Sequence, residues 1–307
     1  MLMPPYDNRD GFIWHNGALV PWREAKLHVL SHGLHYASAV FEGERAYNGS
    51  VFKLTEHSER LAASARILGF NLPLSIDALD QACMETLEAN AIVNGYIRPI
   101  AWRGSEMMAV SAQNTRIHLA IAAWSWPSYF SPEARLRGIR LKTAPWHRPP
   151  PQSAPVFAKA AGLYMICTLS KHSVEAQGYD DALMLDWRGL IAEATGANIF
   201  FVMGDGRLHT PTPDCFLDGI TRQTVIVLAR ECGIEVVERP ITPLELANAT
   251  EVFLTGTAAE VTPVREIDHH RFQPGEITRA LISAYEGATG QSVTAAQTPQ
   301  ATAAGFG

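Results

Sequence analysis

Hydrophobic and polar positions alternate with two different periods along the first part of the chain. The apolar runs on either side of Asn16-Gly17 have the strand period, and this dipeptide is typical of a type I′ hairpin turn. Residues 75–90 place apolar side chains on one face of a helix. Residues 96–104 and 117–126 are again typical of strands. We therefore expect a compact α+β domain over residues 1–125.

The pattern changes after residue 125. Residues 126–138 (WPSYFSPEARLRG) are rich in turn formers and predict a connector between domains. Residues 139–290 alternate strands with helices, one of which stops at Gly233, a good C-terminal cap. Within this second domain, residues 251–264 (EVFLTGTAAEVTPV) predict one strand followed by a loop. Residues 291–307 lack bulky apolar side chains until the end and predict a disordered tail.

Composition excludes several classes of protein. With 47% hydrophobic and 18% charged residues, the chain has the composition of an ordinary globular protein. The formal net charge is -6 and no run is rich in Lys or Arg, so we expect no nucleic-acid partner. No apolar segment has membrane-spanning length, and MLMPPYDNRDG lacks the apolar core of a signal peptide. We expect a cytoplasmic protein without membrane contact. The scattered cysteines and histidines predict reduced thiols and no metal site.

Lys159 differs from the other lysines in its surroundings. It stands between Ala158 and Ala160 and is followed by further small residues, which leave room for a flat ring against the backbone. The other lysines, in polar or basic contexts typical of a solvated surface, are Lys26, Lys53, Lys142 and Lys171. A buried lysine amine is the residue type that forms Schiff bases with carbonyl groups. The pattern raises the hypothesis of an aldehyde cofactor such as pyridoxal phosphate.

Such a cofactor needs a phosphate cradle, and the sequence offers three candidates. Residues 218–221 (DGIT) precede a helix, so the N–H groups of Ile220 and Thr221 would face an anion at its positive end. Residues 255–258 (TGTA) form a second small, hydroxyl-bearing loop. Arg60 supplies a fork-shaped charge. Each signal is weak alone, because most such helix ends bind water and such an arginine is commonly solvated.

The ring of the cofactor needs two further partners. Glu193 ends an apolar strand and is followed by small residues, so its carboxylate is a candidate for keeping the pyridine nitrogen protonated. Taken alone, an acidic residue at a turn or a strand edge is the commoner explanation. Tyr164 stands five positions after Lys159 and is the candidate donor for the phenolic oxygen.

The chain resembles the class IV (fold-type IV) pyridoxal-phosphate aminotransferases, and most closely the branched-chain amino acid aminotransferases. The motifs that carry the resemblance are HGLHYASAVFEGERAY (32–47), HSERLAASARIL (57–68), YIRPIAWRG (96–104), FAKAAGLY (157–164), DDALMLDWRGLIAEATGANIFFV (180–202), LDGITRQTVIVLA (217–229) and FLTGTAAEVTPV (253–264). Seven motifs in family order make a strong match. The resemblance implies an α+β fold with a smaller N-terminal α/β domain, an interdomain loop and a larger C-terminal α/β domain containing a pseudo-barrel.

The resemblance also implies residue roles. Lys159 would hold the cofactor and act as acid and base, with Glu193 at the pyridine nitrogen and Tyr164 at the phenolic oxygen. The implied contacts to the phosphate and ring are Arg60, Ile220, Thr221, Thr257 and Leu217. The implied substrate pocket contains Tyr36, Phe41, Tyr96, Arg98, Trp126 and Tyr129, and the backbone of Thr257 and Ala258 would grip the substrate carboxylate. The loop carrying Tyr36 would enter a neighbouring subunit's site, which implies a homodimer or a larger homo-oligomer.

The implied reaction is transamination of L-leucine, L-isoleucine or L-valine with 2-oxoglutarate. Either Arg98 or Arg45 would take the distal carboxylate of glutamate. Ala37 and Glu44 depart from the family pattern near the substrate pocket, which leaves the acceptor range open. D-amino acid aminotransferases, (R)-amine aminotransferases and aminodeoxychorismate lyases of the same fold are the alternatives, but residues 32–47 and 96–104 favour the L-branched-chain type. A catalytically inert cofactor-binding protein has less support, since Lys159, Glu193 and Tyr164 are all present. A nucleotide-binding enzyme also has less support, since its only sign, Gly204-x-Gly206, is typical of a hairpin turn.

Overall fold

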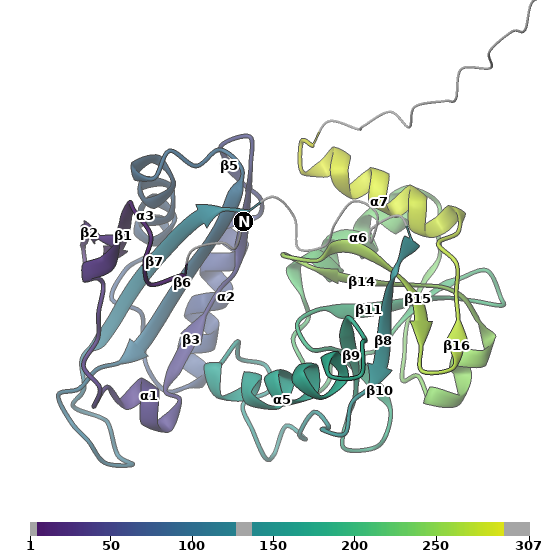
Figure 1. Ribbon diagram of the computed structural model, residues 1–307, viewed down its shortest axis with the longest axis horizontal. Helices are drawn as coiled ribbons and strands as arrows, with labels where there is room; N and C mark the ends of the chain where they lie inside the picture. The colour runs from purple at the N-terminus through teal and green to yellow at the C-terminus, as the bar shows by residue number, and fades with distance from the viewer. Residues whose placement is uncertain (1–4, 127–136, 292–307) are drawn as a thin grey trace, which may run out of the picture.

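The computed structural model describes residues 5–126 and 137–291. Two β-sheets lie side by side, one from each part of the chain, with helices packed on them (Figure 1). The strands of the smaller sheet are β1 (Phe12–His15), β2 (Ala18–Pro21), β3 (Ala39–Phe41), β4 (Glu44–Tyr47), β5 (Ser50–Val51), β6 (Gly95–Arg103) and β7 (Ile117–Ser125). Its order is β2-β1-β7-β6-β4-β5, with β3 also pairing with β6. The helices of this part are η1 (Trp22–Glu24), α1 (His32–Tyr36), α2 (Leu54–Ile67) and α3 (Ile76–Ala89).

Local sequence signals explain the smaller sheet. Asn16 and Gly17 both have positive φ, 51° and 102°, as a type I′ turn requires, so the predicted hairpin is confirmed. The Ser75 side chain accepts a hydrogen bond from the backbone of Ala78 and caps α3. The apolar faces of α2 and α3 then cover the sheet with one continuous core, which includes fully buried Leu61 and Leu79.

The larger sheet is mixed and curves into the half-barrel that the resemblance implied. Its strands are β8 (Ile139–Thr143), β9 (Asp181–Leu185), β10 (Ile191–Ala194), β11 (Asn198–Met203), β12 (Leu208–Thr210), β13 (Val236–Glu238), β14 (Ala249–Gly256), β15 (Glu260–Ile267) and β16 (His270–Arg271). The order is β10-β9-β8-β15-β14-β11-β12-β13, and β16 pairs with β15. The helices are η2 (Ala161–Leu163), α5 (Tyr164–Glu175), α6 (Ile220–Glu231), η3 (Pro243–Asn248) and α7 (Glu276–Ala288).

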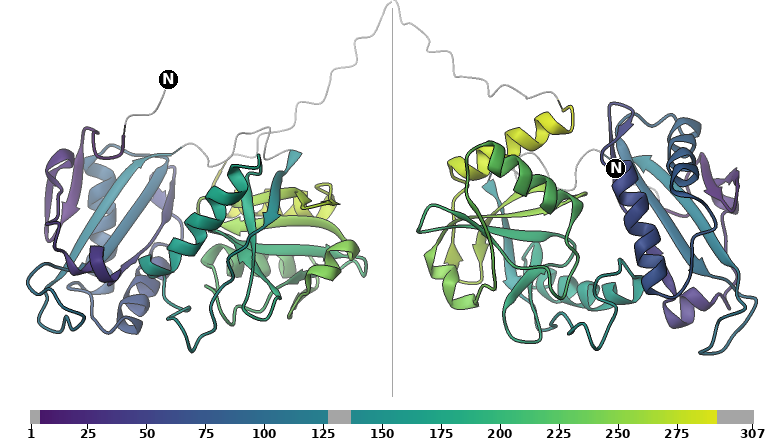
Figure 2. Two further views of the ribbon diagram at one scale, coloured as in Figure 1. Left: turned by 60° about the horizontal axis from the view of Figure 1, so that its bottom comes forward. Right: turned by 180° about the vertical axis from the view of Figure 1, so that it is seen from behind.

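Helices cover the larger sheet in two places. Helices α6 and α7 pack together on β14 and β15, over a core in which Phe200 and Phe253 stack 5.1 Å apart. Helix α5 lies at the boundary between the two sheets, as the further views in Figure 2 also show. Within the described ranges no helix combines the length and the apolar character needed to cross a membrane.

One expectation from the sequence is wrong. Residues 251–264, predicted as one strand followed by a loop, contain the end of β14 and the start of a second strand, β15 (Glu260–Ile267), which pairs antiparallel with β14 and parallel with β8. Pro263 within the run is unfavourable in a strand, because proline has no N–H to donate. The side chains of Val261, Val264 and Ile267 are buried in two cores of the larger sheet, and this burial overrides the local preference.

The two sheets meet at the segment that contains Lys159. Val40 of β3 pairs with Ala160, and the backbone N–H of Phe41 donates to the carbonyl of Lys159 at 3.1 Å. Elsewhere Tyr47 of β4 donates to Glu260 of β15 at 2.8 Å. Separate sheets with separate cores support the proposed boundaries at 1–125 and 139–290. Most of the predicted connector and tail lies outside the described residues.

Candidate active site

A cavity lies where the two parts of the chain meet. All eight residues predicted to bind a cofactor line it, and they are Arg60, Lys159, Tyr164, Glu193, Leu217, Ile220, Thr221 and Thr257. The fold thus brings together side chains separated by almost 200 positions in the sequence.

Lys159 is fixed from both sides of the cavity. Its backbone N–H donates to Ser64 Oγ of α2 at 2.9 Å, and its carbonyl accepts from Phe41. Its Nζ donates to the Tyr164 hydroxyl at 2.9 Å and lies 5.1 Å from the centre of the Phe41 ring. Anchoring of the backbone therefore holds the amine at the cavity, beside the hydroxyl group that the sequence predicted as its neighbour.

Glu193 of β10 lies at another wall of the same cavity. Only 9% of this residue is exposed, and its Oε1 lies 3.3 Å from Nε of Arg148. Asn198 donates to the other carboxylate oxygen over a long 3.4 Å. Burial raises the pKa of Glu193 to about 7, although the charges of Arg148 and Lys159 act in the opposite direction. A cationic N–H donor in the cavity would favour the ionised carboxylate.

The N-terminus of α6 opens onto the cavity. The helix has 12 residues, and its N-cap residue, Gly219, has no side chain to cap the N–H groups of the first turn; the N–H of Gly219 itself donates to Asn198 Oδ1 at 3.2 Å. A Cβ atom at this position would lie 2.2 Å from Asn198 Oδ1, so a larger residue would displace the Asn198 side chain. Buried Thr255 Oγ1, on the same cavity wall, has no hydrogen-bond partner among the described residues. Uncapped N–H groups, a buried unpaired hydroxyl and Arg60 suit an anion.

The site therefore fits a phosphate-bearing pyridine aldehyde. The donors of α6 and Arg60 suit the phosphate, the Glu193 carboxylate suits a protonated ring nitrogen, and the Lys159 amine suits the aldehyde carbon. All of these groups line the cavity, so a single ligand could contact them together.

Four of the predicted substrate residues form a connected cluster beside Lys159. The Arg98 guanidinium lies over the rings of Phe41 and Tyr96, at 4.8 and 5.2 Å, and its Nη2 donates to the Tyr96 hydroxyl at 3.1 Å. The ring centres of Tyr96 and Trp126 are 5.7 Å apart. Gly43 is needed here, because a Cβ atom at this position would lie 1.8 Å from the Tyr96 hydroxyl.

The other predicted substrate residues have different positions. Thr257 lines the cavity and Ala258 follows it in the turn between β14 and β15. Tyr36 does not line the cavity; its ring stacks on His32 and the residue is 44% exposed. Tyr129 lies outside the described residues. Arg45, one of the two arginines that the sequence left open, is buried beside Glu260, with Nη2 3.9 Å from the Glu260 carboxylate.

Arg148 is a site residue that the sequence did not single out. It lines the cavity, is buried, and approaches both Glu193 and the Cys167 sulfur. Its position in the stretch HRPPP gives no local sign of a role, since the contact to Glu193 spans 45 positions in the sequence.

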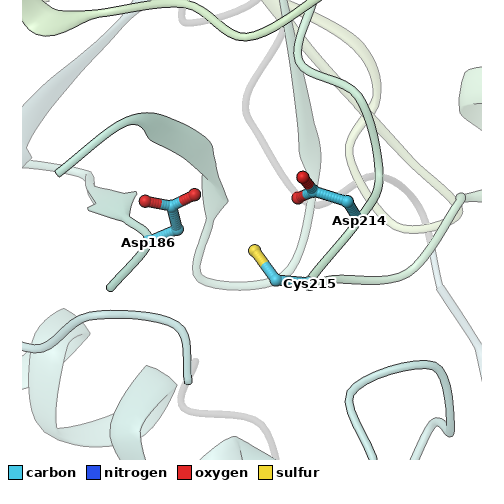
Figure 3. A group of neighbouring side chains, drawn as sticks. All are labelled: Asp186, Asp214 and Cys215. Carbon is cyan, nitrogen blue, oxygen red and sulfur yellow. The ribbon is translucent and has the colours of Figure 1, made fainter. Parts of the chain in front are cut away.

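One cluster of metal-ligating residue types lies outside this cavity. The carboxylates of Asp186 and Asp214 and the thiol of Cys215 face one another (Figure 3). Arg188 already binds both carboxylates, at 2.8 Å to each. Burial raises the pKa of the Cys215 thiol to about 12, so it is not a thiolate at neutral pH. The cluster is therefore an ion-paired contact around Arg188.

Comparisons with known proteins agree with this geometry. The model of the amino-transferase class IV family matches residues 39–267. The branched-chain-amino-acid aminotransferase of Pseudomonas aeruginosa is 41% identical over 285 residues, which cover 91% of this chain and 92% of the relative. A probable branched-chain-amino-acid aminotransferase of Rickettsia felis is 46% identical, covering 83% and 87%.

Solved structures give the same result. The crystal structure of the Escherichia coli branched-chain amino acid aminotransferase superposes with a TM-score of 0.88 at 39% identity, covering 91% of this chain and 94% of that one. A second branched-chain amino acid aminotransferase, from the source abbreviated T.th. and solved with pyridoxamine 5′-phosphate, also gives 0.88, at 41% identity, covering 92% and 95%.

A lysine amine, a buried carboxylate and an uncapped helix N-terminus around one cavity define an enzyme of the cofactor-dependent, amine-transferring class. The chain belongs to the class IV aminotransferases.

Proposed function

We propose that this chain is a pyridoxal-phosphate-dependent aminotransferase that moves the amino group of L-leucine, L-isoleucine or L-valine to 2-oxoglutarate. The products are the branched 2-oxo acid and L-glutamate. The observation that carries the proposal is the Lys159 amine, which lies 2.9 Å from the Tyr164 hydroxyl in a cavity shared with Glu193 and the N-terminus of α6. The names of the chain's close relatives support the choice of substrates.

Three residues around the amine have different roles in proton transfer. When bound, pyridoxal phosphate supplies an electron sink for negative charge at the substrate α-carbon. Lys159 Nζ acts as a positioned general base and takes the proton from that carbon. In the second half-reaction it acts as a general acid and returns a proton to the α-carbon of the amino acid that forms. Tyr164 holds this nitrogen through its hydroxyl. Glu193, kept beside Arg148, provides the negative charge that keeps the ring nitrogen protonated.

Separate groups hold the phosphate. Arg60 supplies a charge, and the first turn of α6 supplies backbone N–H groups at Ile220 and Thr221. Thr257 adds a hydroxyl from the turn after β14, and Leu217 packs on the ring. This separation of the phosphate from the amine fixes the orientation of the reacting end of the cofactor.

The smaller sheet provides the substrate pocket. Phe41, Tyr96 and Trp126 bury the branched side chain, which favours binding by about 1.5–3 kcal/mol. Arg98 takes the distal carboxylate of glutamate, because Arg45 is occupied beside Glu260. The backbone of Thr257 and Ala258 binds the α-carboxylate of either substrate. One pocket then accepts both an apolar and an acidic side chain.

The enzyme acts as a homodimer or a larger homo-oligomer in this proposal. Exposed apolar side chains gather on and before α1, among them Val29 at 71% and Leu34 at 63%, with Tyr36 beside them. An apolar surface of this kind is typical of an interface. In a dimer, Tyr36 would complete the neighbouring subunit's substrate pocket. Sedimentation analysis tests this: a monomer at micromolar concentration would contradict it.

A substrate panel tests the proposed reaction. The purified chain is assayed with L-leucine, D-alanine and (R)-1-phenylethylamine as donors, each with 2-oxoglutarate, and Lys159→Ala serves as the inactive control. We expect turnover with L-leucine. Turnover with only the D- or (R)-donor would contradict the substrate assignment but would leave the aminotransferase class intact.

A further inference from the structure

Glu42 is a buried carboxylate that the proposed reaction does not use. It lies between β3 and β4 and is fully buried. Its Oε1 accepts a hydrogen bond from Arg60 Nε at 2.7 Å, and its Oε2 accepts one from Arg60 Nη2 at 2.9 Å. Oε2 also accepts from His57 Nδ1 at 2.7 Å and from the Gly43 backbone at 3.2 Å. Four donors therefore converge on one carboxylate.

The two contacts to Arg60 fix the plane of its guanidinium group. A bidentate pair between arginine and a carboxylate is among the strongest and most directional hydrogen-bonded contacts in proteins. Within the described ranges, Nη1 of Arg60 donates to no protein group, while the side chain is 18% exposed and lines the cavity. Glu42 thus occupies one edge of the fork and leaves the other edge to the cavity.

His57 prevents the carboxylate from turning. It lies one helical turn before Arg60 on α2, so both side chains reach the same carboxylate. Burial lowers the pKa of His57 even though Glu42 acts to raise it, so the imidazole is neutral at pH 7. Since a carboxylate only accepts hydrogen bonds, Nδ1 carries the proton of that neutral ring. Burial would raise the pKa of Glu42, but the Arg60 charge and these hydrogen bonds hold it well below its usual range.

Glu44 provides a matched comparison two residues further on. It is also fully buried, but neither of its carboxylate oxygens has a hydrogen-bond partner of ordinary geometry in the described part of the chain. Its neighbour is the Cys83 thiol of α3. Burial as such therefore does not explain the four donors around Glu42.

We propose that Glu42 is a positioning residue for the cofactor phosphate, acting by orienting the Arg60 guanidinium toward the phosphate-binding end of the cavity. The inference rests on the proposed role of Arg60. Orientation and charge predict opposite changes in phosphate affinity when the Glu42 carboxylate is removed. A carboxylate near a phosphate repels it, so removal of the charge would strengthen binding if charge decided the outcome. If orientation decides it, removal weakens binding.

The test compares ligands that differ only in the phosphate. The full-length chain is freed of its cofactor and titrated with pyridoxal phosphate and with pyridoxal, with binding followed by absorbance. We expect Glu42→Gln to weaken binding of pyridoxal phosphate roughly ten- to a hundredfold, the usual range for loss of a charge-assisted contact. Binding of pyridoxal should change by less than about twofold. Glu44→Gln, the matched control, should leave both affinities unchanged.

Arg60→Ala separates this inference from the proposed function. We expect the same selective loss of pyridoxal phosphate binding, and Glu42→Gln should add nothing in the Arg60→Ala background. If Arg60→Ala leaves the preference for the phosphate intact, the proposed role of Arg60 is wrong. If Arg60→Ala loses the preference but Glu42→Gln keeps or increases it, only the positioning role of Glu42 is wrong.

Two further variants cover the case in which Glu42→Gln does not fold. Glu42→Asp keeps the charge but shortens the side chain, so it cannot reach Nε and Nη2 of Arg60 together. Arg60→Lys keeps a charge without the planar fork. Circular dichroism confirms folding of each, and we expect both to lose phosphate preference. Unchanged preference in both variants would overturn the inference.

Discussion

Two buried glutamates lie beside the cavity on opposite sheets, and they differ in how completely they are paired. Glu42, on the side of the smaller sheet, accepts four hydrogen bonds and keeps its charge. Glu193, on the larger sheet, has Arg148 at 3.3 Å and one long contact from Asn198, and burial raises its pKa to about 7. A saturated carboxylate holds protein groups in place, whereas an incompletely paired one is available to a ligand.

The same contrast extends to the two walls of the site. Apart from Arg60 of α2, the groups proposed to bind the cofactor belong to the larger part of the chain, and these take part whichever substrate is present. The smaller sheet carries the aromatic cluster and Arg98, which contact side chains that differ between substrates. Substitutions on the larger sheet should therefore affect both half-reactions, while those on the smaller sheet should affect one more than the other.

The largest effect is expected on the larger sheet. Glu193→Gln removes the negative charge that keeps the ring nitrogen protonated, so the electron sink is weakened for every donor. We expect kcat to fall roughly a hundredfold or more with both L-leucine and L-glutamate, the range seen when a preorganised electrostatic contact is lost. Stopped-flow measurement of each half-reaction checks this. A fall confined to one substrate would contradict the contrast between the walls.

Arg98→Leu should have a smaller and selective effect. It removes the cation proposed for the distal carboxylate of glutamate but leaves an apolar surface for leucine. We expect kcat/KM for glutamate to fall about ten- to a hundredfold and that for leucine to change by no more than a few-fold. Equal losses for both substrates would show that Arg98 serves the site in general, as a support for Phe41 and Tyr96.

Gly43 lies against the aromatic cluster of the smaller sheet. In Gly43→Ala the new Cβ atom would lie 1.8 Å from the Tyr96 hydroxyl, so the Tyr96 ring must move. We expect KM for leucine to rise roughly three- to tenfold because the apolar pocket loses its shape. Titration with pyridoxal phosphate should be unchanged, since Gly43 contacts Glu42 only through its backbone N–H, which alanine keeps. A loss of cofactor binding would contradict the assignment of Tyr96 to the substrate pocket alone.

The smallest effect concerns stability alone. Burial first, and the charge of Glu42 next, raise the pKa of Glu44 well above its usual 4.5. A raised folded-state pKa contributes stability that is complete below the unfolded pKa and is lost as pH rises through the folded value. Glu44→Gln should therefore raise the thermal midpoint by a few degrees at pH 8 and by less at pH 5. A larger gain at pH 5 would mean that Glu44 is ionised in the folded chain.

The sequence predicted features that depend on neighbouring residues. The turn at Asn16-Gly17 follows from local chemistry, and the motif match placed eight residues that the fold gathers around one cavity. Strand β15 was missed because its burial between strands far away in sequence outweighs the local signal of Pro263.

The sequence also did not predict the side-chain pairs that form between distant segments. Arg148 meets Glu193 across 45 positions, and Glu42 meets Arg60 across 18. Neither pair has a periodic pattern, so the sequence identified Glu193 and Arg60 without the partners that fix their charge and orientation. The role of Tyr36 in a neighbouring subunit stays a prediction.

Reduction with borohydride identifies the lysine that holds the cofactor. The purified chain is loaded with pyridoxal phosphate, reduced, cleaved and mapped by mass spectrometry, so that any lysine joined to the cofactor keeps a permanent mass tag. We expect a tag on Lys159 and on no other lysine. A tag on Lys26, Lys53, Lys142 or Lys171, or the absence of any tag, would contradict it.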